Sequence, residues 1–390
     1  MIRVLYILNA TDPFGGATKA VMNLLDGTSC ISPYFILPDD SGVAQVLQQK
    51  GIPYSVLNYR MAVYPPLTCL KDYLLFLPRL CGRIWLNSRA AKRVQTIARD
   101  FNADIIHTNT SVNDIGYKAA RKLRIPHVWH IREYGILDFN FHHYPCHSHF
   151  MRRLKSAQSY TICITRDIQR YSGLQDWPAS RVIYDGVLHA NQVCLSLPKK
   201  DYFLFAGRLE EGKGIEELIE AYSVYSSKTE QPMPLWIAGD TRDAGYKDKL
   251  LGIVSHMACK DTIHFLGMRK DILSLMQGAM ALIVPSRAEG FGFITAEGMF
   301  SGALVIGKNV SGTKEQFDNG CQLTKQEIAL RYKTQDELVR HMLQVSRQGI
   351  EPYLPTIKAG QAAAEQLYSV ESHQRAVCQF YNEICKHNGK

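Results

Sequence analysis

The sequence predicts an α/β protein made of two doubly wound, Rossmann-like domains in tandem. The chain has 390 residues, which is too long for one hydrophobic core and suits two domains of about 150 to 200 residues. Apolar runs alternate with helical patterns in both halves, which is typical of a parallel sheet covered by helices on both faces. A polar stretch at 188–200 separates the halves, so we expect one domain over 1–187 and another over 198–368.

Each strand predicted in the first half is a short apolar run bounded by polar or glycine-containing segments. We expect strands at Ile2–Leu8, Tyr34–Leu37, Ser55–Leu57, Ile105–Thr108, His127–His130 and Ser159–Ile164. Helical patterns separate them, for example Ala17–Leu25 and Ser88–Phe101.

The second half repeats this alternation. We expect strands at Tyr202–Ala206, Pro234–Ala238, Thr262–Leu266, Ala279–Val284 and Ala303–Ile306, with helices such as Gly214–Ser226 between them. The last helical pattern, about 370–390, has no strand partner, and we expect it to cross back over the first domain.

Composition narrows the class of protein. Apolar residues make up 46% and charged residues 21% of the chain, as in ordinary globular proteins. The 10 cysteines are scattered, which argues against a zinc site or a disulfide framework and favours a reducing compartment. The N-terminal apolar run is too short for a signal peptide, and no run is long enough to span a bilayer. We therefore expect a cytoplasmic protein.

The net charge of +9 lies entirely in the first half. Residues 1–187 hold 22 Lys and Arg against 13 Asp and Glu, whereas the remainder holds 23 of each. The basic half suits an anionic membrane, a phosphorylated acceptor or nucleic acid. No nucleic-acid-binding module is recognisable, so we expect no nucleic-acid partner.

Basic and apolar residues are interleaved in the segment Met61–Arg99. Tyr73, Leu77 and Trp85 alternate there with Arg79 and Arg83. This pattern is typical of an interfacial amphipathic helix, and it is equally consistent with a helical excursion that packs on the core. We expect Pro78 to interrupt any single long helix.

Two glutamates flank a glycine turn in the second half. Glu289 and Glu297 are separated by seven residues, and Gly290-Phe291-Gly292 lies between them. A strand, a glycine turn and a helix start form an anion pocket, since free N–H groups and the helix dipole point at the ligand. The carboxylates suit sugar hydroxyls, although glutamates near a helix start also simply complement its dipole. The combination predicts a ligand with both phosphate and sugar.

Two cations follow the first strand of the second half. Arg208 and Lys213 lie where a doubly wound domain binds its ligand, at the carboxyl end of a strand. Two such cations neutralise a diphosphate and stabilise the charge of a leaving group. A solvated loop with two exposed bases is the alternative reading.

Two features of the first half are weaker signals. Gly15-Gly16 follows the first strand and suits either close approach to a ligand or a tight turn. It matches neither the dinucleotide fingerprint nor a Walker loop, which disfavours a dehydrogenase or a P-loop ATPase. His130 ends a strand beside Arg132 and Glu133, as either a packing residue or a site residue. The cluster His142, His143, Cys146, His147 and His149 matches no standard metal-ligand spacing.

Taken together, these residues resemble the GT4 family of retaining glycosyltransferases, which has the GT-B fold with a cleft between two domains. The resemblance spans nearly the whole chain and depends most on the two spaced glutamates. The segment His130-Ile131-Arg132-Glu133 is similar to that of members acting in bacterial surface-polysaccharide assembly. The resemblance implies a metal-independent transfer from a nucleotide diphosphate sugar to an acceptor, which we expect to be a lipid-linked saccharide on the inner face of the membrane. It implies no cofactor.

The resemblance also implies roles for single residues. Arg208 and Lys213 would hold the diphosphate, and Glu289 would bind the transferred sugar together with the backbone of Gly290, Phe291 and Gly292. Glu297 would bind the ribose, and Gly267 would precede the loop that meets the base. Gly16 would lie against the phosphates and the acceptor, and His130 near the donor sugar. Two departures, Gly298 in place of alanine and Ser311-Gly312 in place of two glycines, put details of the phosphate contacts in doubt.

Two other functions use the same pattern. A GT-B-fold nucleotide-sugar epimerase would act on the donor without an acceptor. A non-catalytic subunit would bind nucleotide sugar or glycan without turnover.

Overall fold

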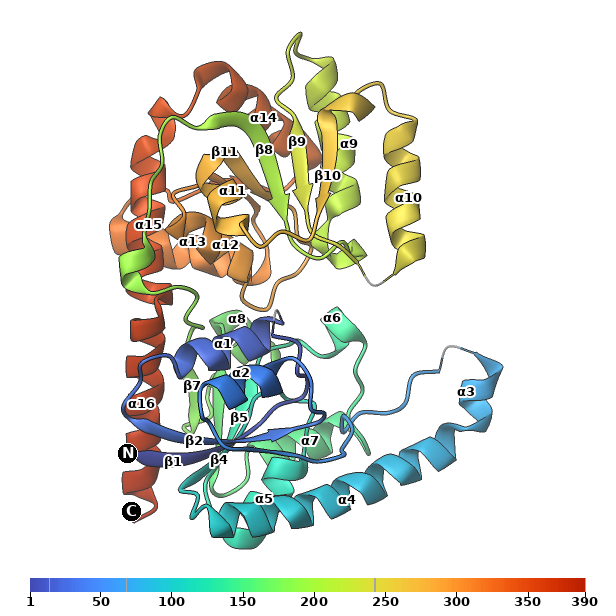
Figure 1. Cartoon of the computed structure of the whole chain (residues 1–390), viewed down its shortest axis with the longest axis vertical. Coiled ribbons are helices and arrows are strands. Elements are labelled where there is room, and N and C mark those ends of the chain that lie inside the picture. The colour runs from blue at the N-terminus through green and yellow to red at the C-terminus, as the bar shows by residue number, and fades with distance from the viewer. Residues whose placement is uncertain (14, 68, 242, 390) are drawn as a thin grey trace. The chain divides into compact units, whose positions relative to one another are not determined.

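A computed structural model describes residues 1–13, 15–67, 69–241 and 243–389, and Figure 1 shows its elements. The chain divides into two compact units. Unit 1 comprises Met1–Gly186 with His373–Lys390, and unit 2 comprises Val187–Ser372. Each unit contains one parallel sheet, which confirms the predicted fold class.

The sheet of unit 1 has seven strands in the order β3-β2-β1-β4-β5-β6-β7. They are β1 (Ile2–Ile7), β2 (Ile31–Leu37), β3 (Tyr54–Val56), β4 (Ile105–Thr108), β5 (His127–Ile131), β6 (Ser159–Cys163) and β7 (Ser180–Val182). Because β2 and β4 lie on opposite sides of β1, the direction of winding reverses between β1 and β4.

Helices cover both faces of this sheet, as the continuous burial of β1 from Val4 to Ile7 requires. Val4 and Tyr6 contribute to one core cluster, and Leu5 and Ile7 to the other, because successive side chains of a strand point to opposite faces. The first face packs against α1 (Gly16–Leu24), α2 (Val43–Gln49) and α16 (Val370–His387), and the second against α4 (Phe76–Asp100) and α5 (Ile115–Leu123). The remaining helices are α3 (Leu70–Leu74), α6 (Ile136–Phe139), α7 (His147–Leu154) and α8 (Arg166–Tyr171).

Helix α4 is longer than the sequence pattern suggests. Pro78 lies in its first turn, where a missing N–H costs no helical hydrogen bond, and the helix runs on to Asp100. The expected break at Pro78 is therefore wrong, and the interruption lies before it, at Leu75 between α3 and α4. The small side chains of Ala90 and Ala91 are buried in the second half of α4, whereas its first half extends away from the sheet (Figure 1).

One pair of cysteines forms a disulfide, which the scattered cysteine pattern did not predict. Cys30, just before β2, is bonded to Cys378 of α16, with a Cα–Cα distance of 6.3 Å. Sequence spacing gave no sign of this pair, because 348 residues separate its members.

The sheet of unit 2 has six strands in the order β10-β9-β8-β11-β12-β13. They are β8 (Lys200–Ala206), β9 (Leu235–Ala238), β10 (Ile263–Gly267), β11 (Ala279–Val284), β12 (Val305–Lys308) and β13 (Leu330–Tyr332). The helices are α9 (Ile215–Ser227), α10 (Ala244–Ser255), α11 (Ile272–Gly278), α12 (Phe293–Phe300), α13 (Ser311–Thr324), α14 (Gln335–Gln348) and α15 (Leu354–Tyr368). The direction of winding reverses here between β8 and β11. Doubly wound sheets bind ligands at the carboxyl ends of the two strands that flank such a reversal.

Candidate functional site

Three glycines join the carboxyl ends of β8, β9 and β10 in unit 2. The N–H of Gly207 donates to Ala238 O at 3.0 Å, and the N–H of Gly239 donates to Gly267 O at 2.9 Å. A Cβ on Gly239 would lie 1.8 Å from Gly207 O, so no other residue fits. Gly267 has a φ of +64°, a conformation that glycine adopts without strain. The predicted residue Gly267 thus lies in closely packed, hydrogen-bonded backbone at the carboxyl ends of these three strands.

The central contact of the site is the ion pair between Lys213 and Glu289. Lys213 lies in the 3-10 turn Glu211–Lys213 after β8, and Glu289 lies in the loop after β11. Nζ of Lys213 is 2.6 Å from Oε1 of Glu289, and the two side chains are 23% and 15% exposed. The pair therefore lies at the point of unit 2 where winding reverses. An ammonium has three donors, so Lys213 keeps hydrogen-bonding capacity for a ligand.

Backbone contacts hold these two loops together. The N–H of Arg287 donates to Gly212 O at 2.9 Å. Gly214 has a φ of +69°, and a Cβ there would lie 2.1 Å from Pro285 O. Glycine is required at position 214 for two reasons. The backbone there is left-handed, and the carbonyl oxygen of Pro285 leaves no room for a Cβ.

The glycine turn after Glu289 packs against the start of α13. A Cβ on Gly312 would lie 2.7–2.8 Å from the carbonyl oxygens of Glu289, Gly290 and Phe291. The side-chain amide of Gln316 donates to Phe291 O at 2.6 Å and to Gly292 O at 3.0 Å. These contacts place the N-termini of α12 and α13 beside the turn, and helix N-termini favour anions.

The two departures from the family pattern have local explanations. Ser311 has a φ of +46°, so it adopts the left-handed conformation that glycine favours, at a cost in strain. A Cβ on Gly298 would lie 2.4 Å from Cδ2 of Leu282. Glycine at 298 therefore lets α12 pack closely on β11.

Arg208 and Glu297 differ in exposure from the partly exposed Lys213–Glu289 pair. Arg208 is 63% exposed, and its guanidinium pairs with Glu210 at 2.8 Å. Glu297 lies on α12 and is buried, with 4% of its surface exposed. The structure therefore brings together Lys213, Glu289 and the turn Gly290–Gly292, with Arg208 on the same loop as Lys213.

The predicted residues of unit 1 lie in two places. Gly16 is the first residue of α1, after the N-cap Gly15, and it is exposed. His130 lies within β5 and is 1% exposed. Its ring belongs to a buried polar network that sequence reasoning did not anticipate.

This network fixes which nitrogen of His130 carries a proton. Nη2 of Arg132 lies 3.2 Å from Nδ1 of His130, and a guanidinium can only donate. Nδ1 therefore accepts and the proton lies on Nε2. Burial lowers the pKa of His130 well below its usual value, and the charge of Arg132 adds to this, so the ring is neutral. Nε2 is buried and has no partner among the described residues.

The rest of the network holds Arg132 and His130 in place. Nη1 of Arg132 lies 2.7 Å and 2.5 Å from the two carboxylate oxygens of Asp185. Nε2 of His107 lies 3.2 Å from Nδ1 of His130, and Nδ1 of His107 lies 2.5 Å from the hydroxyl of Tyr381 on α16. The sequence signal for this network is a histidine within each of two mostly apolar strands, at 107 in β4 and at 130 in β5.

No described group of His, Cys, Asp and Glu side chains could hold a metal ion. Among the described residues, no helix is both long enough and apolar enough to cross a membrane.

The family match lies within unit 2, which spans Val187–Ser372. Residues 192–361 match the family described as glycosyl transferases group 1. An uncharacterized glycosyltransferase of Methanocaldococcus jannaschii is 24% identical over 58% of this chain and 62% of that protein. The O-antigen chain mannosyltransferase B of Escherichia coli is 28% identical over 36% of this chain and 41% of that protein. The matches thus span less than two thirds of these relatives.

Solved structures share the fold over nearly the whole chain. The Anabaena protein HepE, solved in complex with UDP, has a TM-score of 0.77 at 18% identity, with 98% of this chain and 100% of that chain covered. A glycosyltransferase from Rickettsia africae has a TM-score of 0.76 at 15% identity, with 99% of each chain covered. At such identities the likeness establishes the fold alone. The chain therefore has the fold class of GT-B glycosyltransferases, and its residues 192–361 match the family of glycosyl transferases group 1.

Proposed function

We propose that this chain is a retaining, metal-independent glycosyltransferase that moves a sugar from a nucleotide diphosphate sugar to an acceptor hydroxyl. The observation that carries the proposal is the Lys213–Glu289 pair, which lies at the reversal point of unit 2 and within the matched segment 192–361. Doubly wound domains bind nucleotides at such points. The solved complexes of HepE with UDP and with UDP-glucose support a nucleotide sugar as the donor.

Each residue of unit 2 has a chemical task in this proposal. Lys213 and Arg208 hold the diphosphate, and Arg208 exchanges its exposed partner Glu210 for phosphate oxygens. Glu289 and the backbone of the turn Gly290–Gly292 bind hydroxyls of the transferred sugar. Glu297 binds the ribose, and the loop after Gly267 meets the base.

Unit 1 supplies Gly16 and His130. Gly16, at the start of α1, leaves room for phosphate and acceptor. His130 is neutral and carries its proton on Nε2, so it acts as a hydrogen-bond donor to the transferred sugar and not as a general base. An unpaired buried N–H is costly, and a ligand hydroxyl oxygen would satisfy it.

The reaction proceeds by attack of the acceptor on the same face that the diphosphate leaves. The bond from the sugar to the phosphate oxygen breaks, its electron pair stays with the diphosphate, and Lys213 and Arg208 stabilise the added charge. The acceptor oxygen bonds to the sugar carbon and gives its proton to the leaving phosphate. The buried carboxylates of unit 1 agree with this route, because Asp185, Glu133 and Asp114 are already ion-paired or hydrogen-bonded.

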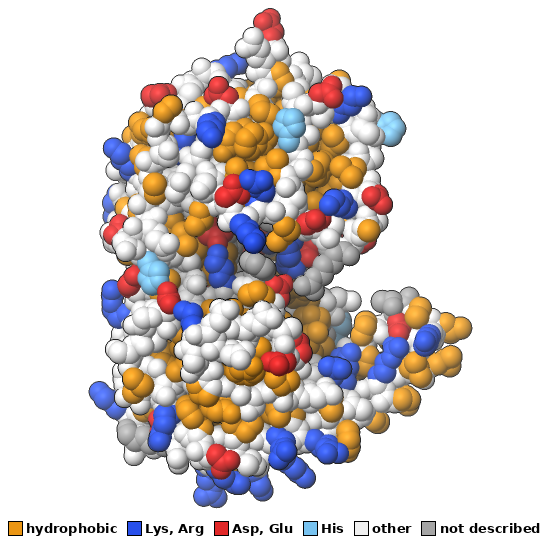
Figure 2. All heavy atoms as spheres, in the orientation of Figure 1, with side chains coloured by type: hydrophobic (Ala, Val, Ile, Leu, Met, Phe, Trp, Pro, Cys, Tyr) orange, Lys and Arg blue, Asp and Glu red, His pale blue; other side chains and the backbone are white. Residues whose placement is uncertain are grey.

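The acceptor in this proposal is a lipid-linked saccharide of surface-polysaccharide synthesis, met at the cytoplasmic face of the membrane. Its support is a basic arm, which we define as residues 69–89. Leu70, Leu74 and Leu77 are 67–78% exposed there, beside basic side chains such as Lys71. Figure 2 shows hydrophobic and basic side chains gathered on this part of α3 and α4. Such a surface suits anionic lipid.

Product analysis tests the activity. Purified protein is incubated with UDP- and GDP-sugars, with and without a lipid-linked saccharide extract, and the released nucleotide and sugar products are separated. A transferase releases nucleotide diphosphate and extends the acceptor, with the anomeric configuration of the donor retained. Isomerised sugar without acceptor would instead indicate an epimerase, and binding without turnover would indicate a non-catalytic subunit.

A further inference from the structure

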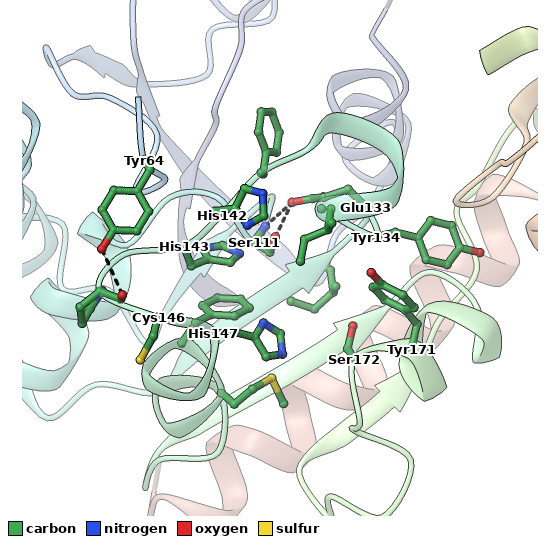
Figure 3. Close-up of a pocket in the computed structure, with 17 residues that line it drawn as sticks. Tyr64, Ser111, Glu133, Tyr134, His142, His143, Cys146, His147, Tyr171 and Ser172 are labelled. Atoms are coloured by element: carbon green, nitrogen blue, oxygen red, sulfur yellow. Dashed lines mark hydrogen bonds between the residues drawn. The ribbon is translucent and has the colours of Figure 1, made fainter. Parts of the chain in front are cut away.

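A pocket of about 480 Å³ lies within unit 1, next to the carboxyl ends of β4 and β5. Figure 3 shows its lining, which includes Ser111, Glu133, Tyr134, His143 and Tyr171. These residues come from the loops after β4 and β5, from the segment before α7, and from α8. The pocket has the size of a small-molecule site, and none of the roles proposed above uses it.

Glu133 is the one acidic or basic side chain, histidines aside, among the residues that line this pocket. Its Oε1 accepts from the N–H of Ser111 at 2.8 Å and from Oγ of Ser111 at 2.6 Å, and its Oε2 accepts from the N–H of Arg132 at 3.1 Å. Each carboxylate oxygen can accept two hydrogen bonds, so Oε2 keeps capacity for a ligand hydroxyl. The group is 8% exposed, which disfavours an anionic ligand beside it.

The rest of the lining is mostly aromatic and apolar. The rings of Tyr134 and Tyr171 meet edge to face at 5.2 Å, and the ring of His143 stacks on Phe150 at 3.8 Å. Burial lowers the pKa of His143 to about 4, so this ring is neutral near pH 7. Flat, uncharged rings suit the C–H face of a sugar, and one buried acceptor suits its hydroxyls.

One wall of the pocket is tied to the basic arm. Tyr64 lines the pocket, and its ring stacks on Phe76 of α4 at 5.7 Å. Its hydroxyl donates to Pro145 O at 3.1 Å, as Figure 3 shows. The guanidinium of Arg83 donates to Val63 O at 3.0 Å. A ligand in this pocket therefore lies beside the surface that we assign to the membrane.

We propose that this pocket binds an uncharged saccharide unit of the acceptor, with hydroxyls on Glu133 and a ring face on the aromatic wall. The identity of this saccharide as the acceptor rests on the proposed transfer reaction. The binding of a saccharide in the pocket does not depend on that reaction. The occupant is a sugar and not the lipid chain, because an alkyl chain would leave the buried carboxylate of Glu133 without the hydroxyl partner that a sugar provides.

Saturation-transfer NMR on the full chain tests this directly. The probes are methyl α-mannoside, methyl β-glucoside, methyl N-acetyl-β-glucosaminide, octyl β-glucoside and the charged methyl glucuronide. We expect saturation of ring protons for at least one uncharged glycoside and none for the glucuronide. Tyr171→Ala should weaken the binding roughly 3- to 10-fold, the usual effect of losing an aromatic contact.

Neighbouring residues on α6 provide a matched control. Ile136 lines the pocket and is 45% exposed, whereas Leu137 is 66% exposed and lies outside the lining. Ile136→Ser should weaken glycoside binding and Leu137→Ser should leave it unchanged. Because both side chains are at the surface, both variants should fold.

Three results would overturn the proposal. The first is that none of the uncharged glycosides shows saturation transfer. The second is that wild type and Tyr171→Ala bind the glycosides equally well. The third is that the octyl chain of octyl β-glucoside is saturated in place of its sugar ring. Titration of the same samples with UDP and GDP separates this failure from failure of the proposed function. Nucleotide binding with no glycoside effect rejects the pocket alone, and glycoside binding with no nucleotide binding rejects the transferase alone.

Discussion

The two units share one type of fold but use their charges differently. Unit 1 buries an ion pair, Arg132–Asp185, whose side chains are 6% and 1% exposed, and buries His107, His127, His130 and His373. In unit 2 none of the four histidines is buried, and the Lys213–Glu289 pair is partly exposed at the strand ends. The sequence gives unit 1 a net charge of +11 and unit 2 a net charge of −2. Thus charge in the interior of unit 1 is structural, and charge at the rim of unit 2 is available to a ligand.

The largest expected effect concerns the buried pair of unit 1. Arg132→Met leaves Asp185 as an unpaired buried charge, which typically costs about 3–5 kcal/mol of unfolding free energy. Urea unfolding followed by fluorescence of Trp129, a buried residue of unit 1, measures this cost. Arg181→Met is the control, because Arg181 is 50% exposed and should lose less than about 1 kcal/mol. Equal losses would show that the two arginines do not differ in the way proposed.

Substitutions of the charged residues at the strand ends of unit 2 should lower turnover without lowering stability. Arg208→Ala and Lys213→Ala should each lower kcat on the order of 10²-fold, as does the loss of a donor to a developing charge. Lys249→Ala is the control, because Lys249 is 54% exposed and pairs with Glu216. Turnover near that of wild type in the first two variants would contradict the diphosphate assignment.

Acid should destabilise unit 1 before unit 2. Burial lowers the pKa of His127 to about 3, so below about pH 6.5 the unfolded chain takes up a proton that the folded chain does not. Stability is therefore lost as the pH falls from about 6.5, by about 2 kcal/mol for this residue at pH 5. Thermal unfolding from pH 7 to pH 5 measures the slope.

His127→Gln should make this slope shallower, and His264→Gln, at an exposed position of unit 2, should not. An unchanged slope in His127→Gln would mean that other groups dominate acid unfolding.

The smallest expected effect is on membrane binding. Lys71→Ala, in the basic arm, should weaken binding to phosphatidylglycerol vesicles by about 1 kcal/mol, and added salt should weaken it further. Flotation at low salt measures this binding. Lys260→Ala, at an exposed position of unit 2, should have no effect. No flotation of the wild type at low salt would remove the membrane from the proposal.

Much of the fold could be predicted because its strands are continuous apolar runs. The predicted bounds of β4 and β11 agree with the structure, and those of β1, β5 and β6 differ by one residue at one end. The edge strands β7 and β13 were missed, since each is three residues long and contains an arginine. The start of α4 was not predicted, because Pro78 was expected to interrupt the helix and instead lies in its first turn.

The site could be predicted only as a set of residues. Spacing placed Lys213 and Glu289 near strand ends, but their contact depends on β8 and β11 being neighbours, which is a matter of strand order. The pocket beside Glu133 was not foreseen, because its lining comes from separate segments between residues 64 and 172. No periodicity links such segments.

The sequence by itself determined the alternation of strands and helices, the two domains' fold class and the location of the excess charge. These follow from local patterns of apolar and basic residues, which act within a few turns of chain. The tertiary structure alone decided that Tyr381 reaches His107, that Arg132 sets the proton on His130 and that Lys213 meets Glu289. The first and third of these contacts join residues that are far apart in the chain, and the second depends on how the ring of His130 is oriented. The packing of whole helices and strands determines the distances and the ring orientation.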